Sequence, residues 1–197
     1  STIITSTETD DPNEKQVTTV GRISPHVEVK IIDDTGCIVE PGKTGELLSR
    51  GYNVMQGYWD DPELTAESID VAGWMHTGDL ATMDEEGFCN IVGRVKDMVI
   101  RGGENIYPAE IERILLADER VDDAVVVRKL DSRWGEIPVA FVVAKDQSLE
   151  AKDVENLCRA HLAGYKRPKE VFFLKFDDMP RSDSGKIIRE SLEKRLT

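Results

Sequence analysis

The sequence predicts an α+β protein with a distorted, antiparallel, β-barrel-like region over residues 1–96 and a smaller α+β domain over residues 97–197. Strand follows strand in the first half, whereas helices and strands alternate in the second. The charge balance shifts at the same place: residues 1–96 hold 7 basic and 18 acidic side chains, and residues 97–197 hold 18 and 20. We therefore place a domain boundary at residues 94–97.

The strands of the first half are β-branched or apolar runs that end in turn residues. They are expected over residues 27–32, 37–39, 45–51, 79–83 and 88–92. Residues 84–87, Asp-Glu-Glu-Gly, predict a hairpin between the last two. The only helix expected in this half covers residues 62–69, because Pro62 suits a first helical turn and Asp60 or Asp61 can act as its N-cap.

The second half alternates between the two kinds of element. Strands are expected over residues 98–101, 124–127, 139–144 and 171–176, and a Gly102–Gly103 turn follows the first of them. Helical spacing of apolar residues predicts two helices, one that begins at Pro108 and a second over residues 150–162. A terminal helix is expected to place Ile188, Leu192 and Leu196 on one face.

Composition excludes several classes of protein. The net charge of −13 argues against a nucleic-acid binder, and no apolar run approaches the roughly 20 residues that span a bilayer. Residues 1–10 resemble no signal peptide. Cys37, Cys89 and Cys158 lack metal-ligand or disulfide spacing, which is typical of reduced thiols and predicts a cytoplasmic protein.

The C-terminal stretch differs in charge from the rest of the chain. Residues 159–197 hold 10 basic and 6 acidic side chains. A net positive segment in an acidic protein indicates a local site for a small polyanion, and solvated helix faces are the alternative explanation.

Four clusters are more specific in sequence than folding alone requires. They are GELLSRG from Gly45 with MQGYW from Met55, GWMHTGDL from Gly73, GRVKD from Gly93 with GGENIYPAEIE from Gly102, and PRSDSGKIIR from Pro180. Each alone has an ordinary structural explanation. In this order and spacing they resemble the adenylate-forming superfamily of acyl-CoA synthetases, peptide-synthetase adenylation domains and luciferases. The resemblance covers almost the whole chain and is strongest to a fatty-acyl or aryl-acid CoA ligase.

Two motifs of that family are absent from the 197 residues. One is the Ser/Thr/Gly-rich phosphate loop that ends in Pro-Lys-Gly, and the other is Tyr-Gly-x-Thr-Glu, which helps to hold nucleotide and magnesium. We therefore expect the chain to be the C-terminal portion of a longer enzyme. Residues 1–96 would complete the large AMP-binding domain, and residues 97–197 would form its mobile cap.

The resemblance implies roles for individual residues in nucleotide chemistry. Lys186 matches the lysine that bridges the attacking carboxylate and the nucleotide, and an ammonium on a flexible stem suits that role. Asp79 matches the carboxylate that accepts hydrogen bonds from both ribose hydroxyls. Arg94 matches a second residue that faces the ribose or phosphate. Ordinary turn, strand-end or helix-start positions are the alternatives.

Other positions match the family's hinge between the two domains and its CoA-binding residues. Lys96 and Asp97 occupy the hinge, where rotation of the cap requires backbone freedom. Gly102 and Gly103 would border the pantetheine of CoA, although both also suit a hairpin turn. The basic run that contains Lys166 and Arg167 is a weaker candidate for the CoA phosphates.

The function implied is ATP-dependent acyl-CoA synthesis: carboxylate and ATP give acyl-AMP and pyrophosphate, and CoA then displaces AMP. ATP/AMP and CoA are the expected ligands, and Mg²⁺ would arrive with ATP through the missing N-terminal part. No metal site is expected within the chain, and His76 is assigned no role as a base. An acyl-AMP ligase, a carrier-protein-loading adenylation domain and a non-catalytic binding cap remain the alternatives.

Overall fold

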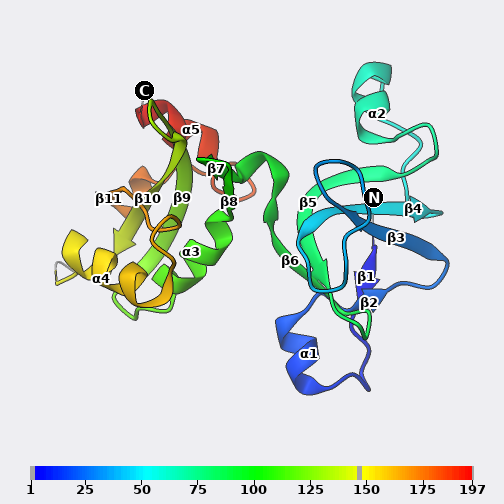
Figure 1. The fold of residues 1–197 in the computed structure, drawn as a ribbon, viewed down its shortest axis with the longest axis horizontal. Coiled ribbons are helices and arrows are strands. Elements are labelled where there is room, and N and C mark those ends of the chain that lie inside the picture. Colours follow the sequence, from blue (N-terminus) through cyan, green and yellow to red (C-terminus); the bar gives the residue numbers. More distant parts are fainter. Residues whose placement is uncertain (1–2, 146–147, 197) are drawn as a thin grey trace. The chain divides into compact units, whose positions relative to one another are not determined.

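A computed structural model describes residues 3–145 and 148–196 of the chain. The chain divides into two compact units, Ser1–Lys96 (unit 1) and Asp97–Thr197 (unit 2), and each has its own sheet (Figure 1). Helices and antiparallel strands are both present, as the α+β prediction requires. Within the described ranges, no helix has the length and apolar character needed to cross a bilayer.

Unit 1 is built on a four-stranded antiparallel sheet. Its order is β3 (Val27–Ile32), β4 (Gly45–Gly51), β5 (Met75–Met83) and β6 (Cys89–Arg94). The predicted hairpin is the β5–β6 connection. Among the described residues the sheet is open rather than a closed barrel, with β3 and β6 at its edges. The side chains packed together on it include Ile31, Leu47, Ala81 and Cys89.

Smaller elements surround this sheet. The strands β1 (Thr5–Ser6) and β2 (Arg22–Ile23) pair with each other. Helix α2 (Pro62–Ser68) is confirmed, and Asp61 is its cap, because its Oδ1 accepts the Leu64 N–H at 2.9 Å. Helix α1 (Asn13–Thr18) was not predicted. Its sequence NEKQVT buries no residue, so it has no apolar periodicity to detect.

The strand expected over residues 37–39 is wrong in extent. Only one bridge, between Ile38 and Ile32, forms there. The turn itself is as expected, since the Asp33 carboxylate accepts the N–H groups of Thr35 and Cys37, each at 2.9 Å. Residues 46–51 of β4 pair with all six residues of β3 along one edge, so the return lies along the other, outer edge of β3 and forms only this single bridge there.

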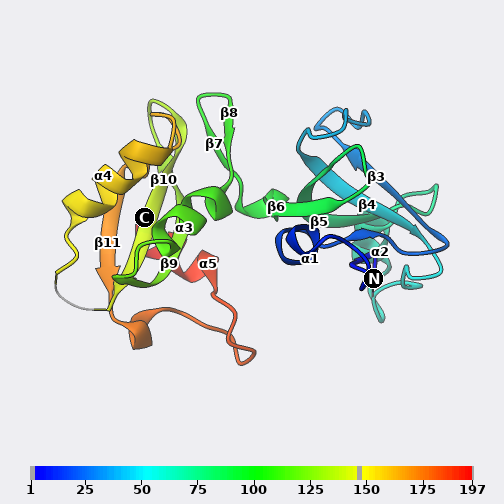
Figure 2. The same cartoon turned by 90° about the horizontal axis from the view of Figure 1, so that it is seen from below.

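Unit 2 combines a five-stranded mixed sheet with helices. The strands are β7 (Val99–Arg101), β8 (Glu104–Ile106), β9 (Val121–Asp131), β10 (Gly135–Ala144) and β11 (Glu170–Leu174). The helices are α3 (Pro108–Leu116), α4 (Ala151–His161) and α5 (Arg189–Glu193). Strand β10 pairs antiparallel with β9 and parallel with β11, and α4 makes the crossover between β10 and β11 (Figure 2).

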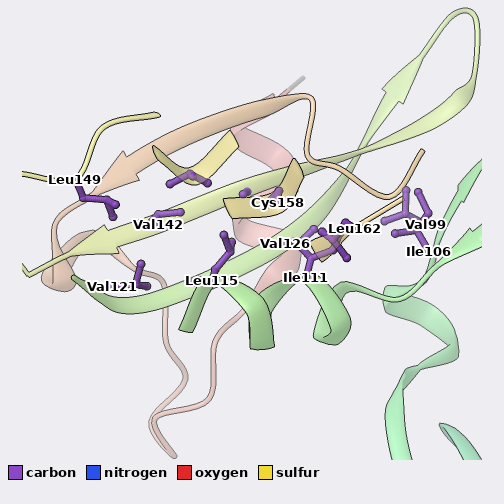
Figure 3. Packing of buried hydrophobic residues seen from close by; sticks show 13 residues of the cluster. Val99, Ile106, Ile111, Leu115, Val121, Val126, Val142, Leu149, Cys158 and Leu162 are labelled. Carbon is purple, nitrogen blue, oxygen red and sulfur yellow. The ribbon is translucent and has the colours of Figure 1, made fainter. Parts of the chain in front are cut away.

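Both faces of the β9–β10 pair are buried. Val126 and Val142 point toward α3 and α4, in a cluster that also holds Ile111, Leu115 and Cys158 (Figure 3). The alternate residues, among them Val125, Val127, Val139 and Phe141, form a second cluster with Leu192 of α5. A strand pair buried on both faces explains the continuous apolar runs in the sequence.

The terminal helix is shorter than predicted. Residues 189–193 are α-helical, and Lys194–Leu196 continue as a 3₁₀ turn. Leu192 is buried, and Leu196 packs against the same cluster. Ile188, expected on that face, instead precedes the helix as its N-cap residue and is partly exposed. Three apolar residues at spacing four cannot by themselves locate the first helical turn.

The contribution of this core can be measured with two adjacent leucines of α3. Leu115 has no exposed surface, whereas Leu116 is 48% exposed. Leu115→Ala is expected to destabilise unit 2 by about 2–5 kcal/mol, through lost burial and a cavity. Leu116→Ala is expected to stay within about 0.5 kcal/mol. Native-state hydrogen exchange of the β9 and β10 amides measures this free energy, and equal effects of the two changes would contradict the assigned packing.

Candidate functional site

Two of the predicted nucleotide-binding residues lie directly opposite each other in unit 1. Asp79 of β5 pairs with Arg94 of β6 in the antiparallel register. Arg94 Nε lies 3.0 Å from Asp79 Oδ1, and the side chains are 55% and 30% exposed. The pair therefore offers carboxylate acceptors and guanidinium donors on an accessible surface, the groups that suit a diol and a phosphate.

The segment of β5 just before Asp79 lies at an irregularity in the β4–β5 pairing and is held by several hydrogen bonds. Thr77 Oγ1 accepts the Asp79 N–H at 3.1 Å and donates to the Leu47 carbonyl at 2.7 Å. Gly78 has φ +69°, a left-handed conformation that glycine adopts without strain. The local structure thus explains the Thr-Gly-Asp motif: Thr77 and Gly78 fix the backbone that carries the Asp79 carboxylate.

Glu46 is a residue of this site that sequence reasoning quoted but did not assign. Its Oε1 accepts the Gly78 N–H at 3.2 Å, and its Oε2 lies 2.9 Å from His76 Nδ1. Glu46 belongs to β4, so its carboxylate connects that strand to the segment of β5 just before Asp79. The Gly-Glu-Leu motif was the only signal in the sequence. His76 is therefore a partner of Glu46.

The predicted hinge residues lie in a 3₁₀ turn, η1 (Val95–Asp97), at the boundary between the units. Lys96 is exposed. Asp97 is less exposed, and its Oδ2 lies 3.3 Å from Arg189 Nε. Short 3₁₀ turns are frequent connectors between structural elements, so the hinge assignment of Lys96 and Asp97 stays a prediction.

Gly102 and Gly103 form the turn of the β7–β8 hairpin. Their φ angles are +59° and +88°, so both positions favour glycine on backbone grounds alone. A Cβ on Gly102 would also lie 3.0 Å from the Trp134 ring, whereas a Cβ on Gly103 would meet no described atom within 4 Å. Beside them, Arg101 is buried, and its Nη1 donates to the Tyr165 carbonyl at 2.7 Å.

Lys186 is exposed on a tight loop of unit 2. The Ser182 N–H donates to the Lys186 carbonyl at 2.8 Å, and the Gly185 N–H donates to the Ser182 carbonyl at 2.8 Å. The Ile188 N–H donates to the Pro180 carbonyl at 2.9 Å and closes the base of the loop. Lys186 is therefore presented to solvent by a loop with internal hydrogen bonds.

Two arginines fasten this loop to the body of unit 2. Arg181 donates to the Asp123 carboxylate of β9 and, at 3.1 Å, to the Gly185 carbonyl. Arg189 makes bonds to Glu112 and Val126 just after the loop. Sequence reasoning assigned neither arginine, because partners 58 and 77 residues away leave no local pattern.

The two basic residues proposed for CoA phosphates have structural partners. Lys166 Nζ lies 2.7 and 2.9 Å from the Glu110 carboxylate oxygens, and its side chain is only 21% exposed. Arg167 donates from Nε to the Leu162 carbonyl at 3.0 Å, at the end of α4. Both charges are thus already engaged within unit 2, where they hold α3 and α4.

The residues of the described ranges include no group of three or more His, Cys, Asp or Glu side chains that could hold a metal ion. The arrangement in unit 1 offers a partly exposed carboxylate with a guanidinium beside it. Unit 2 offers an exposed ammonium on an anchored loop and a glycine hairpin.

Two family models match parts of the chain. Residues 1–59 match the model of the AMP-binding enzyme domain, and residues 110–186 match that of the AMP-binding enzyme C-terminal domain. Both matches lie within the two units described above, on either side of the 3₁₀ turn.

Similar proteins span the whole chain. A medium-chain acyl-CoA ligase of Danio rerio is 44% identical over 94% of this chain and 31% of its own length, and an indoleacetate–CoA ligase of Aromatoleum aromaticum is 43% identical over 91% and 35%. The o-succinylbenzoate CoA synthetase of Bacillus subtilis, solved with an acyl-adenylate, is 37% identical with a TM-score of 0.83, over 91% of this chain and 36% of that one. The chain spans about a third of the length of the curated relatives it matches.

Proposed function

Because this chain belongs to the adenylate-forming enzyme superfamily, we propose that it is the C-terminal part of an ATP-dependent acid:CoA ligase. The reaction joins a carboxylate to AMP with release of pyrophosphate, and the thiol of CoA then displaces AMP to give the thioester. Residues 1–96 complete the nucleotide-binding domain, and residues 97–197 form a cap that rotates between the two steps.

Asp79 and Arg94 hold the nucleotide in both steps. The half-exposed Asp79 carboxylate can accept the two ribose hydroxyls, while the Arg94 guanidinium beside it holds the carboxylate in place and donates toward the ribose or phosphate. Glu46 and Thr77 fix the segment of β5 that carries Asp79. The cross-strand pair is the observation that carries the proposal, because it combines two motifs distant in sequence into one nucleotide-binding surface.

Lys186 acts in the first step only. Its ammonium neutralises charge that develops as the carboxylate attacks the α-phosphate, and a positioned cation is an effective source of rate there. The internal hydrogen bonds of its loop reduce the cost of ordering the side chain. Rotation at Lys96 and Asp97 then removes Lys186 and brings the Gly102–Gly103 hairpin toward the thiol of CoA.

Recognition of the CoA phosphates by Lys166 and Arg167 requires two side chains that already have partners within unit 2. Both side chains would have to share their charge with the Glu110 carboxylate and the Leu162 carbonyl. The neighbouring Lys169 is exposed and better placed to contact a solvated phosphate.

We propose that residues outside this chain select the acyl group. Two relatives that are 43–44% identical to this chain over its length are named for a medium-chain acid and for indoleacetate, which differ greatly in shape. The similarity of this region in enzymes with such different substrates supports an acyl pocket outside it.

The free cysteines Cys37, Cys89 and Cys158 support an intracellular, cytoplasmic location.

Transfer to a carrier protein instead of CoA is the main alternative within the superfamily, and a non-catalytic cap is the alternative from another class. The intact Gly185–Lys186 and Gly102–Gly103 pairs argue against the latter. The full-length protein distinguishes the three when it is assayed for pyrophosphate release and for thioester formation with CoA or a carrier as acceptor. Absence of carboxylate-dependent pyrophosphate release would refute both ligase hypotheses.

The 197-residue chain alone is expected neither to hydrolyse ATP nor to form acyl-AMP. Its sequence lacks the phosphate loop whose backbone N–H groups bind the triphosphate. The measurement is carboxylate-dependent release of pyrophosphate, with the full-length protein as positive control. Release above background by the chain alone would show that the nucleotide site is complete without that loop.

A further inference from the structure

Arg189 connects three segments of unit 2 that are far apart in sequence. Its Nη1 donates to Glu112 Oε1 of α3 at 2.5 Å and to the Val126 carbonyl of β9 at 2.7 Å, and its Nη2 donates to Glu112 Oε2 at 3.0 Å. Its Nε lies 3.3 Å from Asp97 Oδ2. The planar fork of an arginine can make all these contacts at once, whereas a lysine cannot.

The position of Arg189 along the chain shows that these contacts connect the hinge with the loop of Lys186. It is the first residue of α5 and follows Lys186 by three residues. Asp97 is the first residue of unit 2. The Arg189 side chain therefore links Asp97 at the hinge directly to the segment that presents the Lys186 ammonium. Its only other partners described above are Glu112 and Val126.

The anchors of Arg189 are themselves firmly held. Glu112 Oε1 also accepts the Val126 N–H at 2.7 Å, and the Glu112 side chain is only 12% exposed. A mostly buried carboxylate with a bidentate guanidinium partner and a backbone donor is a rigid support. The ion pair with Asp97 is the longest and most exposed contact of the set, so it is the one that can be removed without dismantling the rest.

We propose that Arg189 is a positioning residue that fixes Asp97 to the body of unit 2 and thereby confines the hinge rotation to the bonds before the Asp97 Cα. The side chain of Asp97 then moves with unit 2, and the loop that carries Lys186 turns with the same body. This inference rests on the proposed two-step ligase. It assigns to the hinge carboxylate an electrostatic role in addition to its backbone freedom.

Three variants of the full-length protein test this role. Asp97→Asn removes the charge but keeps the volume and the backbone freedom, and Arg189→Lys keeps the charge but loses the fork. Arg113→Gln is the matched control, because it removes an exposed positive charge next to Glu112 in α3. Hydrogen exchange of residues 95–98 is expected to accelerate in the first two variants and to stay unchanged in the control.

The rates of the two half-reactions distinguish a positioning role from a structural one. Loss of a purely structural contact would lower both rates together. Both variants are expected to slow pyrophosphate release by about threefold or more while thioester formation from supplied acyl-AMP changes less. The double variant should be no slower than the slower single variant, because both changes disrupt the same Asp97–Arg189 ion pair.

Three results would overturn the inference. One is unchanged hydrogen exchange at residues 95–98 in both variants. The second is an equal loss in both half-reactions that follows a lowered melting temperature, and the third is losses that multiply in the double variant. If the wild-type protein releases no pyrophosphate, the proposed function fails instead, and the exchange measurement still decides whether Arg189 holds Asp97.

Discussion

Replacing Lys186 by alanine in the full-length enzyme is expected to slow acyl-adenylate formation by roughly 10²–10³-fold, the cost of removing one positioned charge-stabilising group. Thioester formation from supplied acyl-AMP is expected to change far less, because the attack of a thiol on the adenylate does not need this cation. Lys186 is exposed and contributes no buried contact, so the loss should occur without a change in thermal stability. Pyrophosphate release and thioester formation, measured separately, check both expectations.

Lys175→Ala is the matched control for this experiment. Lys175 is an exposed lysine of the same unit, 11 residues before Lys186, and it lies outside the motif. Its replacement removes the same charge from the cap and should leave both half-reactions within about twofold, as for an ordinary surface substitution. An equal loss in the two half-reactions of Lys186→Ala would show that Lys186 serves a shared or structural role.

The parts of the fold that the sequence predicts well are those with a strong local pattern. The β9–β10 pair is apolar on both faces, and helices α3 and α4 carry apolar residues at helical spacing, so all four elements were located. Helix α1 was missed because a helix that buries no side chain has no such pattern. The start of α5 was placed too early because Ile188 is apolar without being part of the packed face.

The candidate site divides in the same way. Asp79, Lys186 and the hinge lie in motifs whose order and spacing are readable along the chain. The residues that hold them, Glu46 and Arg189, act on partners 32 and 77 positions away. Such contacts depend on strand register and on how α3 packs against β9. Local sequence does not encode them.

Replacing Asp97 by proline tests the hinge directly. In the structure Val95–Asp97 form a 3₁₀ turn, so Lys96 has a helical backbone conformation. Proline fixes its own φ near −65° and disfavours a helical conformation of the preceding residue. The variant should therefore disfavour the turn seen here and populate hinge conformations in which Lys96 is extended.

A restricted hinge has unequal consequences for the two half-reactions. If the trapped orientation is the one that presents Lys186, pyrophosphate release survives while CoA-dependent turnover falls by about 10²-fold, the loss expected from misplaced reacting groups. If the other orientation is trapped, the pattern is reversed. Asp97→Asn separates this backbone effect from the lost ion pair with Arg189, because asparagine leaves φ free. A melting temperature close to that of the wild type must accompany the result, since a folding defect would lower both rates together. A well-folded Asp97→Pro enzyme that runs both half-reactions at wild-type rates would place the pivot elsewhere in the chain.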